Sequence, residues 1–256
     1  MEVLSEEAVD QLAESEAIDE ARDVVDSFEV RLQQLRSGNL GADEGLKLLS
    51  REASNLRLKM QTVAITGLAP TTHRLDDYLA GLKTIETQNI DDVQAFVDRI
   101  SSLLDGEKVA VEEVAEVVRS LPRKTTFDIK DVTVTDTEVT LVIPQRAAAR
   151  IVERELAECG YHVSTVLNPI EALSLIVETR PDMVITAQVM PRVTGVDLAC
   201  ALAAMPATKD IPVALLTSLE PNHPDLSPLP VNVGLIRRGV SFGDDLAHVL
   251  ERFKIT

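Results

Sequence analysis

The sequence predicts two domains of different fold class, an all-α antiparallel four-helix bundle followed by an α/β domain with a doubly wound, five-stranded parallel sheet. The length of 256 residues suits two domains of the usual size. Apolar residues recur at spacings of three and four in the N-terminal half, which is typical of amphipathic helices. In the C-terminal half, β-branched runs alternate with helical segments, and this pattern favours parallel strands covered on both faces.

Four amphipathic helices are expected before residue 105, because four segments each carry one apolar stripe. The stripes begin at Ile18, Leu46, Leu75 and Ile90. The expected N-cap of the fourth helix is Asn89, which directly precedes its stripe. Four such helices joined by short loops close into an antiparallel bundle, since each has one stripe to bury.

A shorter fifth helix is expected before Pro122, with apolar positions at Val111, Val114, Val118 and Leu121. The apolar residues of the acidic segment 1–16 are out of phase with the first helix. This segment is therefore expected to be a separate turn of helix, a partner-binding segment or a frayed end. The bundle with its extra helix is expected to span residues 17–121, and a charged, Thr-rich linker is expected at residues 122–137.

The C-terminal domain is expected to span residues 138–256 and to repeat a strand and a helix. The expected strands are residues 139–143, 161–166, 183–187, 212–217 and 233–236. These runs are apolar along their whole length, so both faces of the sheet are expected to be covered. Residues 218–232 contain four prolines. Proline removes a backbone donor and resists helix, so an extended loop is expected there.

The charge of the chain excludes several kinds of partner. The formal net charge is -17, and residues 1–138 carry 29 acidic against 15 basic residues. Such a field repels phosphate backbones and anionic lipid, so neither nucleic acid nor a membrane surface is an expected partner. The sequence shows no signal-peptide pattern and no apolar run near the roughly 20 residues of a membrane span. We therefore expect a cytoplasmic protein that binds other proteins.

A polar row follows the second helix, about 100° away from its apolar stripe. Its members recur at spacings of three and four and are Lys47, Ser50, Ser54, Arg57 and Gln61. Judged on the residues alone, this row is an ordinary solvated helix face.

Two stretches give the first domain a family likeness. The segments EASNLRL (residues 52–58) and THRLDDYLAGL (residues 72–82) resemble the histidine-phosphotransfer domain of bacterial phosphorelays. That family carries its phosphorylated histidine in the pattern His-x-Leu-Lys-Gly. In this chain Ser54 stands at the phosphoacceptor position, Leu56 agrees, and Arg57 and Leu58 replace lysine and glycine. The resemblance implies a docking row made of Ser50, Ser54, Arg57, Leu58 and Gln61.

The substitution at the phosphoacceptor position matters chemically. A phosphoramidate on an imidazole nitrogen has enough transfer potential to pass its phosphoryl group to a carboxylate, whereas a serine phosphate ester does not. Leu58 would also fill the space that glycine leaves for a partner. The bundle is therefore not expected to relay phosphate through Ser54.

His73 is the one histidine of the first domain, and it leaves two hypotheses open. The first is a surface histidine paired with a carboxylate one turn on, Asp76 or Asp77. The second is a displaced phosphoacceptor, which would make the chain a phosphotransfer protein.

Three stretches of the second domain together resemble the receiver domain of response regulators. They are GYHVSTVLNPIEALSLI, PDMVITAQVMPRVTGVDL and IPVALLTS, in the family's order and spacing. The resemblance covers residues 138 to 256 and implies a flavodoxin-like strand order, 2-1-3-4-5. It also implies a site at the carboxyl ends of strands 1 and 3, where the order reverses.

The receiver-like site is expected to be degenerate. A receiver holds Mg²⁺ with an acidic pair after strand 1 and takes the phosphoryl group on an aspartate at the end of strand 3. Here Pro144, Gln145 and Arg146 follow the first strand, and Ala187 ends the third. Asp182 lies at the opposite end of that strand. Thr217 matches the family's hydroxyl residue, and Arg237 and Arg238 follow the last strand. Because the site offers these arginines no anion, they are expected to pair with other carboxylates or to face solvent.

Two domains that resemble phosphorelay components and lack the phosphoacceptor suggest a protein that works by its surfaces. We expect a non-catalytic regulatory or adaptor protein of bacterial two-component signalling, without metal or cofactor. The expected partners are a histidine kinase, a receiver or another phosphorelay protein, and a homodimer is possible. The alternatives are phosphotransfer through His73 and an oligomeric scaffold.

Overall fold

The computed structural model describes residues 6–123, 136–239 and 241–255, with side chains from residue 13 onward. The chain forms two compact units, residues 1–125 and 126–256, and each is described by itself below. Most of the predicted linker, residues 122–137, lies outside the described residues.

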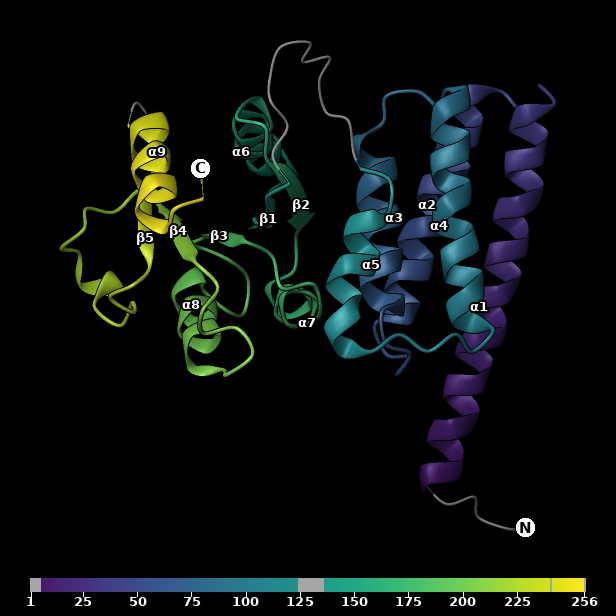
Figure 1. Ribbon diagram of the computed structural model, residues 1–256, viewed down its shortest axis with the longest axis horizontal. Helices are drawn as coiled ribbons and strands as arrows, with labels where there is room; N and C mark the ends of the chain where they lie inside the picture. The colour runs from purple at the N-terminus through teal and green to yellow at the C-terminus, as the bar shows by residue number, and fades with distance from the viewer. Residues whose placement is uncertain (1–5, 124–135, 240, 256) are drawn as a thin grey trace. The chain divides into compact units, whose positions relative to one another are not determined.

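The first unit is helical, as the sequence predicts (Figure 1). Its long helices are α1 (Glu6–Arg36), α2 (Ala42–Met60), α3 (Leu68–Gly81) and α4 (Thr87–Leu104). Helix α2 packs against α1 and α3, and α4 packs against the same two helices. The four share one apolar core, which includes Phe28, Leu49, Leu75 and Phe96. Of the helices in the described ranges, none combines the length and apolar character needed to cross a membrane.

Helix α1 is continuous from Glu6 to Arg36, so, of the alternatives for residues 1–16, the backbone does not show a separate turn of helix. Figure 1 shows the N-terminal end of α1 running past the ends of the neighbouring helices. The Ala64 N–H donates to the Glu14 carboxylate at 3.0 Å, which ties α1 to the segment after α2. Out-of-phase apolar residues are therefore compatible with one uninterrupted helix.

The start of α4 differs from the predicted one. The N-cap of α4 is Glu86, and Asn89 is the third residue of the helix. The Asn89 side chain accepts the Glu86 N–H at 2.9 Å, so Asn89 completes a capping box from inside the helix. Helix α3 begins at Leu68, because Gly67 turns the chain in a left-handed conformation with φ 84°.

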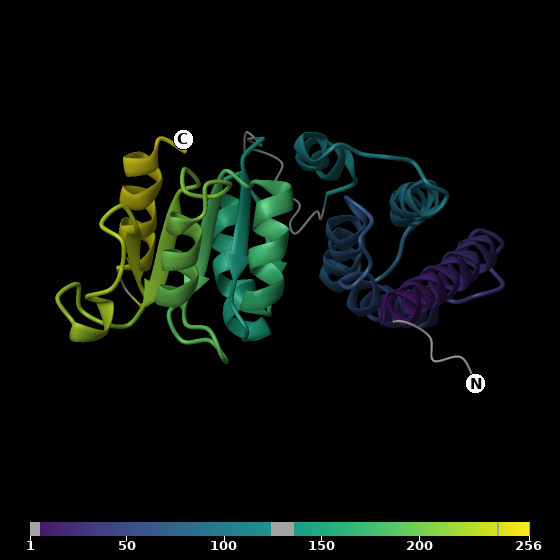
Figure 2. The same ribbon diagram turned by 90° about the horizontal axis from the view of Figure 1, so that it is seen from below.

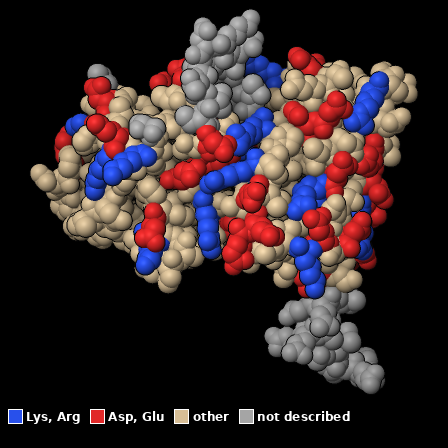
Figure 3. Space-filling view, in the orientation of Figure 1, with Lys and Arg blue, Asp and Glu red and all other residues tan. Residues whose placement is uncertain are grey.

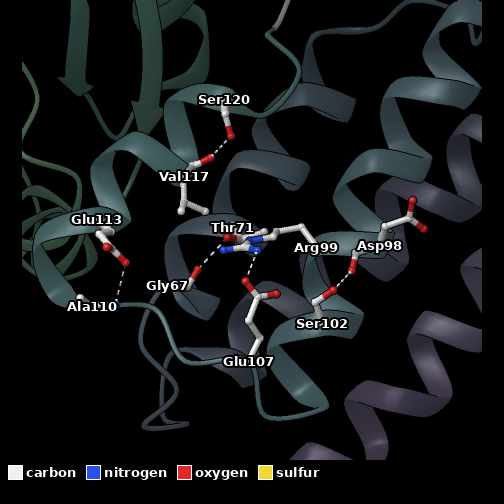
Figure 4. Close-up of polar contacts among 10 residues, drawn as sticks. All are labelled: Gly67, Thr71, Asp98, Arg99, Ser102, Glu107, Ala110, Glu113, Val117 and Ser120. Atoms are coloured by element: carbon white, nitrogen blue, oxygen red, sulfur yellow. Dashed lines mark hydrogen bonds and ion pairs between the residues drawn. The ribbon is translucent and has the colours of Figure 1, made fainter.

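The predicted fifth helix is shorter than expected. A 3-10 turn, η1 (Val111–Glu113), leads into α5 (Val114–Ser120). Val114 and Val118 are buried, but Val111 is 48% exposed and is not part of the apolar stripe. Figure 4 shows how this region is held, with the Arg99 guanidinium of α4 donating to Glu107 at 2.8 Å.

The second unit is a five-stranded, wholly parallel sheet, and its order β2-β1-β3-β4-β5 confirms the prediction. The strands are β1 (Glu138–Val142), β2 (His162–Val166), β3 (Met183–Ala187), β4 (Val213–Thr217) and β5 (Gly234–Arg237). The helices are α6 (Arg146–Glu158), α7 (Pro169–Thr179), α8 (Gly195–Ala204) and α9 (Phe242–Phe253). Figures 1 and 2 show helices on both faces, α6 and α9 on one and α7 and α8 on the other.

The segment between β4 and β5 is a loop, as its prolines predict. Its described residues contain one 3-10 turn, η2 (Pro224–Leu226), and no α-helix between residues 218 and 232. Leu226 is buried in the core of this unit, and Leu219 and Leu229 pack against that core, so the loop is anchored at several points.

Candidate functional site

The carboxyl ends of the parallel strands meet at one edge of the sheet. Strand β1 ends at Val142, β3 at Ala187, β4 at Thr217 and β5 at Arg237. The strand order reverses between β1 and β3, and doubly wound folds bind their ligands at that point. The residues that follow these four strands therefore form the candidate site.

Ala187 is completely buried at the end of β3. Gly195, the first residue of α8, packs directly on it, and a Cβ added to Gly195 would lie 2.3 Å from the Ala187 carbonyl oxygen. The Gly195 N–H donates to the Gln188 carbonyl at 2.9 Å. The loop after β3 therefore folds back tightly over the strand end.

A hydrogen-bonded pair crosses the edge beside Ala187. The Thr217 hydroxyl donates to the side-chain oxygen of Gln188 and accepts the Leu219 N–H at 3.0 Å. The Gln188 N–H donates to the Leu216 carbonyl at 2.9 Å. Thr217 is thus held at the site by an amide. Thr217 was predicted as a site residue and Gln188 was not, although an amide directly after a buried strand is a usable signal.

Arg237 is occupied by a carboxylate, as expected for an arginine without an anion at the site. Its guanidinium donates twice to Asp245 of α9, at 2.8 and 3.0 Å, and its backbone N–H donates to the same carboxylate at 3.0 Å. These contacts lower the pKa of Asp245 below its ordinary value. Asp245 was not singled out in the sequence, although it stands in the first turn of the helix after β5.

None of the other predicted site residues adds a carboxylate side chain to this edge of the sheet. Gln145 is the N-cap of α6 without a side-chain cap bond, Pro144 is half-buried, and Arg146 and Arg238 are exposed. Asp182 lies at the far end of β3, where it accepts the Glu138 N–H at 2.8 Å.

The site's donor set does not fit a magnesium ion. Magnesium binds hard oxygen ligands, usually carboxylates with waters. The residues that end or follow the strands supply an alanine, an amide, a hydroxyl and guanidinium groups, and the Asp245 carboxylate beside them is bound by Arg237. Within residues 6–123, 136–239 and 241–255, no group of three or more His, Cys, Asp and Glu side chains is arranged to hold a metal.

In the first unit, part of the predicted docking row is withdrawn from solvent. The Ser54 hydroxyl of α2 donates to Asp76 of α3 at 2.6 Å. The Arg57 Nε lies 3.1 Å from the other oxygen of Asp76, and both side chains of this ion pair are largely buried. The prediction of a solvated row is therefore wrong at these two positions. Ser50 is half-buried, while Gln61 and Leu58 are exposed.

His73 is buried, with 5% of its surface exposed, so the expected surface histidine is wrong. The first turns of α3, including the neighbouring Thr72 and Arg74, are buried as well. Of its two predicted partners, Asp76 is engaged by Ser54 and Arg57. Ser54, Arg57 and Asp76 therefore form a triad that joins α2 to α3 and that was not predicted from the sequence.

No protein-family model matches the chain. A stretch of 66 residues is 41% identical to the transcriptional regulatory protein PrrA of Mycobacterium leprae, and it covers 26% of this chain and 28% of that protein.

Among solved structures, the chain is similar to the signal receiver domain of a signal transduction histidine kinase from Syntrophus aciditrophicus, at 27% identity, with a TM-score of 0.42, over 47% of this chain and 92% of that one. It is also similar to the chemotaxis protein CheY4 of Vibrio cholerae, at 22% identity, with a TM-score of 0.40, over 46% of this chain and 98% of that one. Each similarity covers less than half of the present chain.

Proposed function

We propose that this chain is a non-catalytic regulatory or adaptor protein of two-component signalling, which acts by docking proteins rather than by passing a phosphoryl group. In this proposal the first unit is a histidine-phosphotransfer-like four-helix bundle and the second is a pseudo-receiver. The strand order 2-1-3-4-5 supports a receiver-like second unit, and the local identity to a transcriptional regulatory protein supports a regulatory role.

The observation that carries the proposal is Ala187 at the end of β3. A phosphoryl group needs a nucleophilic oxygen there, and a methyl side chain supplies none. Phosphoryl transfer depends on positioning and on neutralising charge with metal ions and cations. Gln188 is already bonded to Thr217, and Arg237 to Asp245. These two pairs engage the polar side chains that end or follow β3, β4 and β5.

The proposal is tested by phosphorylation of the intact protein. Incubation with acetyl phosphate and Mg²⁺ should give no phosphoprotein on a phosphate-affinity gel, and calorimetry should show no beryllofluoride binding. The variant Ala187→Asp restores one carboxylate but leaves Pro144 and Gln145 after β1, so it should also stay unlabelled. Tight binding of Mg²⁺ and beryllofluoride to the wild-type protein would overturn the proposal.

The docking role calls for a separate experiment. The protein is expected to capture a histidine kinase, a receiver or another phosphorelay protein from a bacterial lysate, with partners identified by mass spectrometry. Recovery of none of these classes would count against two-component signalling. Homodimerisation remains a proposal, and light scattering over a range of concentrations tests it.

The alternative of a phosphoacceptor at His73 is not favoured by the structure. An imidazole that exchanges phosphoryl groups with a partner must reach solvent, and His73 is buried. Acid-labile label that disappears in His73→Ala would restore this alternative.

A further inference from the structure

The loop between β4 and β5 bends at His223, whose backbone and side chain both hold the turn. The His223 N–H donates to the Glu220 carbonyl at 2.9 Å, and the His223 carbonyl accepts the Leu226 N–H at 2.9 Å. The imidazole Nδ1 accepts the Asp225 N–H at 3.2 Å, which makes His223 the N-cap of η2. Because Leu226 is buried in the core of the second unit, this turn positions one anchor of the loop.

This cap depends on the charge of the imidazole. A neutral imidazole has one ring nitrogen that donates and one that accepts, whereas both ring nitrogens of an imidazolium donate. An Nδ1 that accepts a backbone N–H therefore belongs to the neutral form. Histidine ordinarily changes its charge between about pH 5 and about pH 8, whereas the hydroxyl or amide of the usual cap residues does not. A proton can therefore remove this cap within that range.

A carboxylate lies beside the same ring nitrogen. The His223 Nδ1 is 3.6 Å from a carboxylate oxygen of Asp225, and the histidine side chain is 40% exposed, so water reaches it in the folded protein. Among the residues that the structure describes, Asp225 is the one charged group with which this imidazole interacts. Figure 3 shows mainly uncharged residues at the lower left of the drawn face, where this loop lies in Figure 1. The imidazole therefore has two alternative partners, and both belong to Asp225.

We propose that His223 is a pH-sensitive cap of the loop between β4 and β5. The neutral imidazole accepts the Asp225 N–H and holds η2 in the arrangement described above. The imidazolium carries a proton on Nδ1, so it releases that N–H and donates to the Asp225 carboxylate instead. As the pH falls, the turn before Leu226 thus exchanges a backbone partner for a side-chain partner. The inference goes beyond the proposed docking function and does not depend on it.

The two ends of the loop are held by groups that keep their charge. Near its start, the Leu219 N–H donates to the Thr217 hydroxyl at 3.0 Å. Near its end, the Arg252 guanidinium donates to the Val231 carbonyl at 3.1 Å. Hydroxyl, carbonyl and guanidinium groups do not change charge between about pH 5 and about pH 8. The change is therefore expected within residues 223–226, while both ends of the loop stay in place.

The test is NMR spectroscopy of the full-length, ¹⁵N-labelled protein, titrated from about pH 8 to about pH 5. The ¹⁵N shift of the His223 Nδ1 atom should report an unprotonated nitrogen at the start and a protonated one at the end. The Asp225 amide proton should move upfield along the same curve, because it loses its acceptor, and the Leu226 amide should follow. The Leu219 amide is the internal control, and its shift should stay constant.

Three variants test the role of the imidazole. His223→Asn supplies a cap oxygen that accepts throughout the titration, so the Asp225 amide should no longer respond to pH. His223→Ala has no cap, and its Asp225 amide should resemble that of the acidified wild-type protein at every pH. The matched control is His248→Gln, which removes an exposed histidine of α9 and should leave the Asp225 response unchanged. Circular dichroism checks that each variant folds.

The second partner is tested by Asp225→Ala, which keeps the backbone N–H and removes the carboxylate. In acid, this variant has neither the cap nor the ion pair, so its Leu226 amide should exchange with solvent faster than that of the wild type. Equal exchange in the two proteins would overturn the exchange of partners. An Asp225 amide that ignores the titration of His223, or a response that survives in His223→Asn, would overturn the pH-sensitive cap itself.

Discussion

At the scale of single residues, the contact between Ala187 and Gly195 fixes the loop over the end of β3. A Cβ on Gly195 would meet the Ala187 carbonyl oxygen at 2.3 Å and a Leu215 methyl carbon at 2.6 Å. Because the backbone oxygen cannot move away cheaply, Gly195→Ala should lower the free energy of unfolding by about 1–3 kcal/mol. Gly243→Ala is the control, since nothing lies within 4 Å of its Cβ position. Urea denaturation measures both, and an unchanged Gly195→Ala would refute the tight packing.

A second residue-scale prediction concerns pH. Hydrogen bonds from Arg237 lower the pKa of Asp245 in the folded protein. A carboxyl group with a lowered pKa contributes stability above its unfolded pKa and loses it as the pH falls through the folded pKa. Asp245→Asn should therefore be less stable than the wild type near neutral pH, and the difference should shrink below about pH 4. Urea titrations at several pH values test this, with the exposed Asp244→Asn as control.

Single residues also show what the sequence allowed to be predicted at the site. The strand pattern alone places Ala187, which is not an acid, at the end of β3, because the ends of a buried strand can be read from the strand's own sequence. The pairing of Thr217 with Gln188 joins residues 29 positions apart. Such a contact depends on strand neighbours and side-chain rotamers, which one sequence does not specify.

At the scale of elements, the strands were predicted to within one residue at each end, and the helix starts less well. A strand buried on both faces is marked along its whole length, whereas a helix start depends on a few capping contacts. At α4, the N-cap is Glu86, and Asn89, which has a good capping side chain, is the third residue of the helix. At α3, the helix begins directly after Gly67, seven residues before the predicted apolar stripe starts at Leu75.

The link between α2 and α3 gives an element-scale prediction. Ser54 donates to Asp76 at 2.6 Å, whereas the similarly placed Ser50 has no such bond with another described residue. Ser54→Ala should therefore lower the free energy of unfolding by about 1 kcal/mol, the usual net value of such a hydrogen bond. Ser50→Ala should leave it nearly unchanged. Equal effects of the two substitutions in guanidinium denaturation would show that the bond does not hold the helices together.

At the scale of the whole molecule, stability is expected to reside in two separate cores. The apolar clusters of the two units share no residue among those that the structure describes. Calorimetry should accordingly show two unfolding transitions, and a core substitution should shift only its own. Leu75→Ala and Ile185→Ala each remove most of a fully buried side chain, at a cost of about 2–5 kcal/mol. If either substitution moved both transitions equally, the two units would unfold as one.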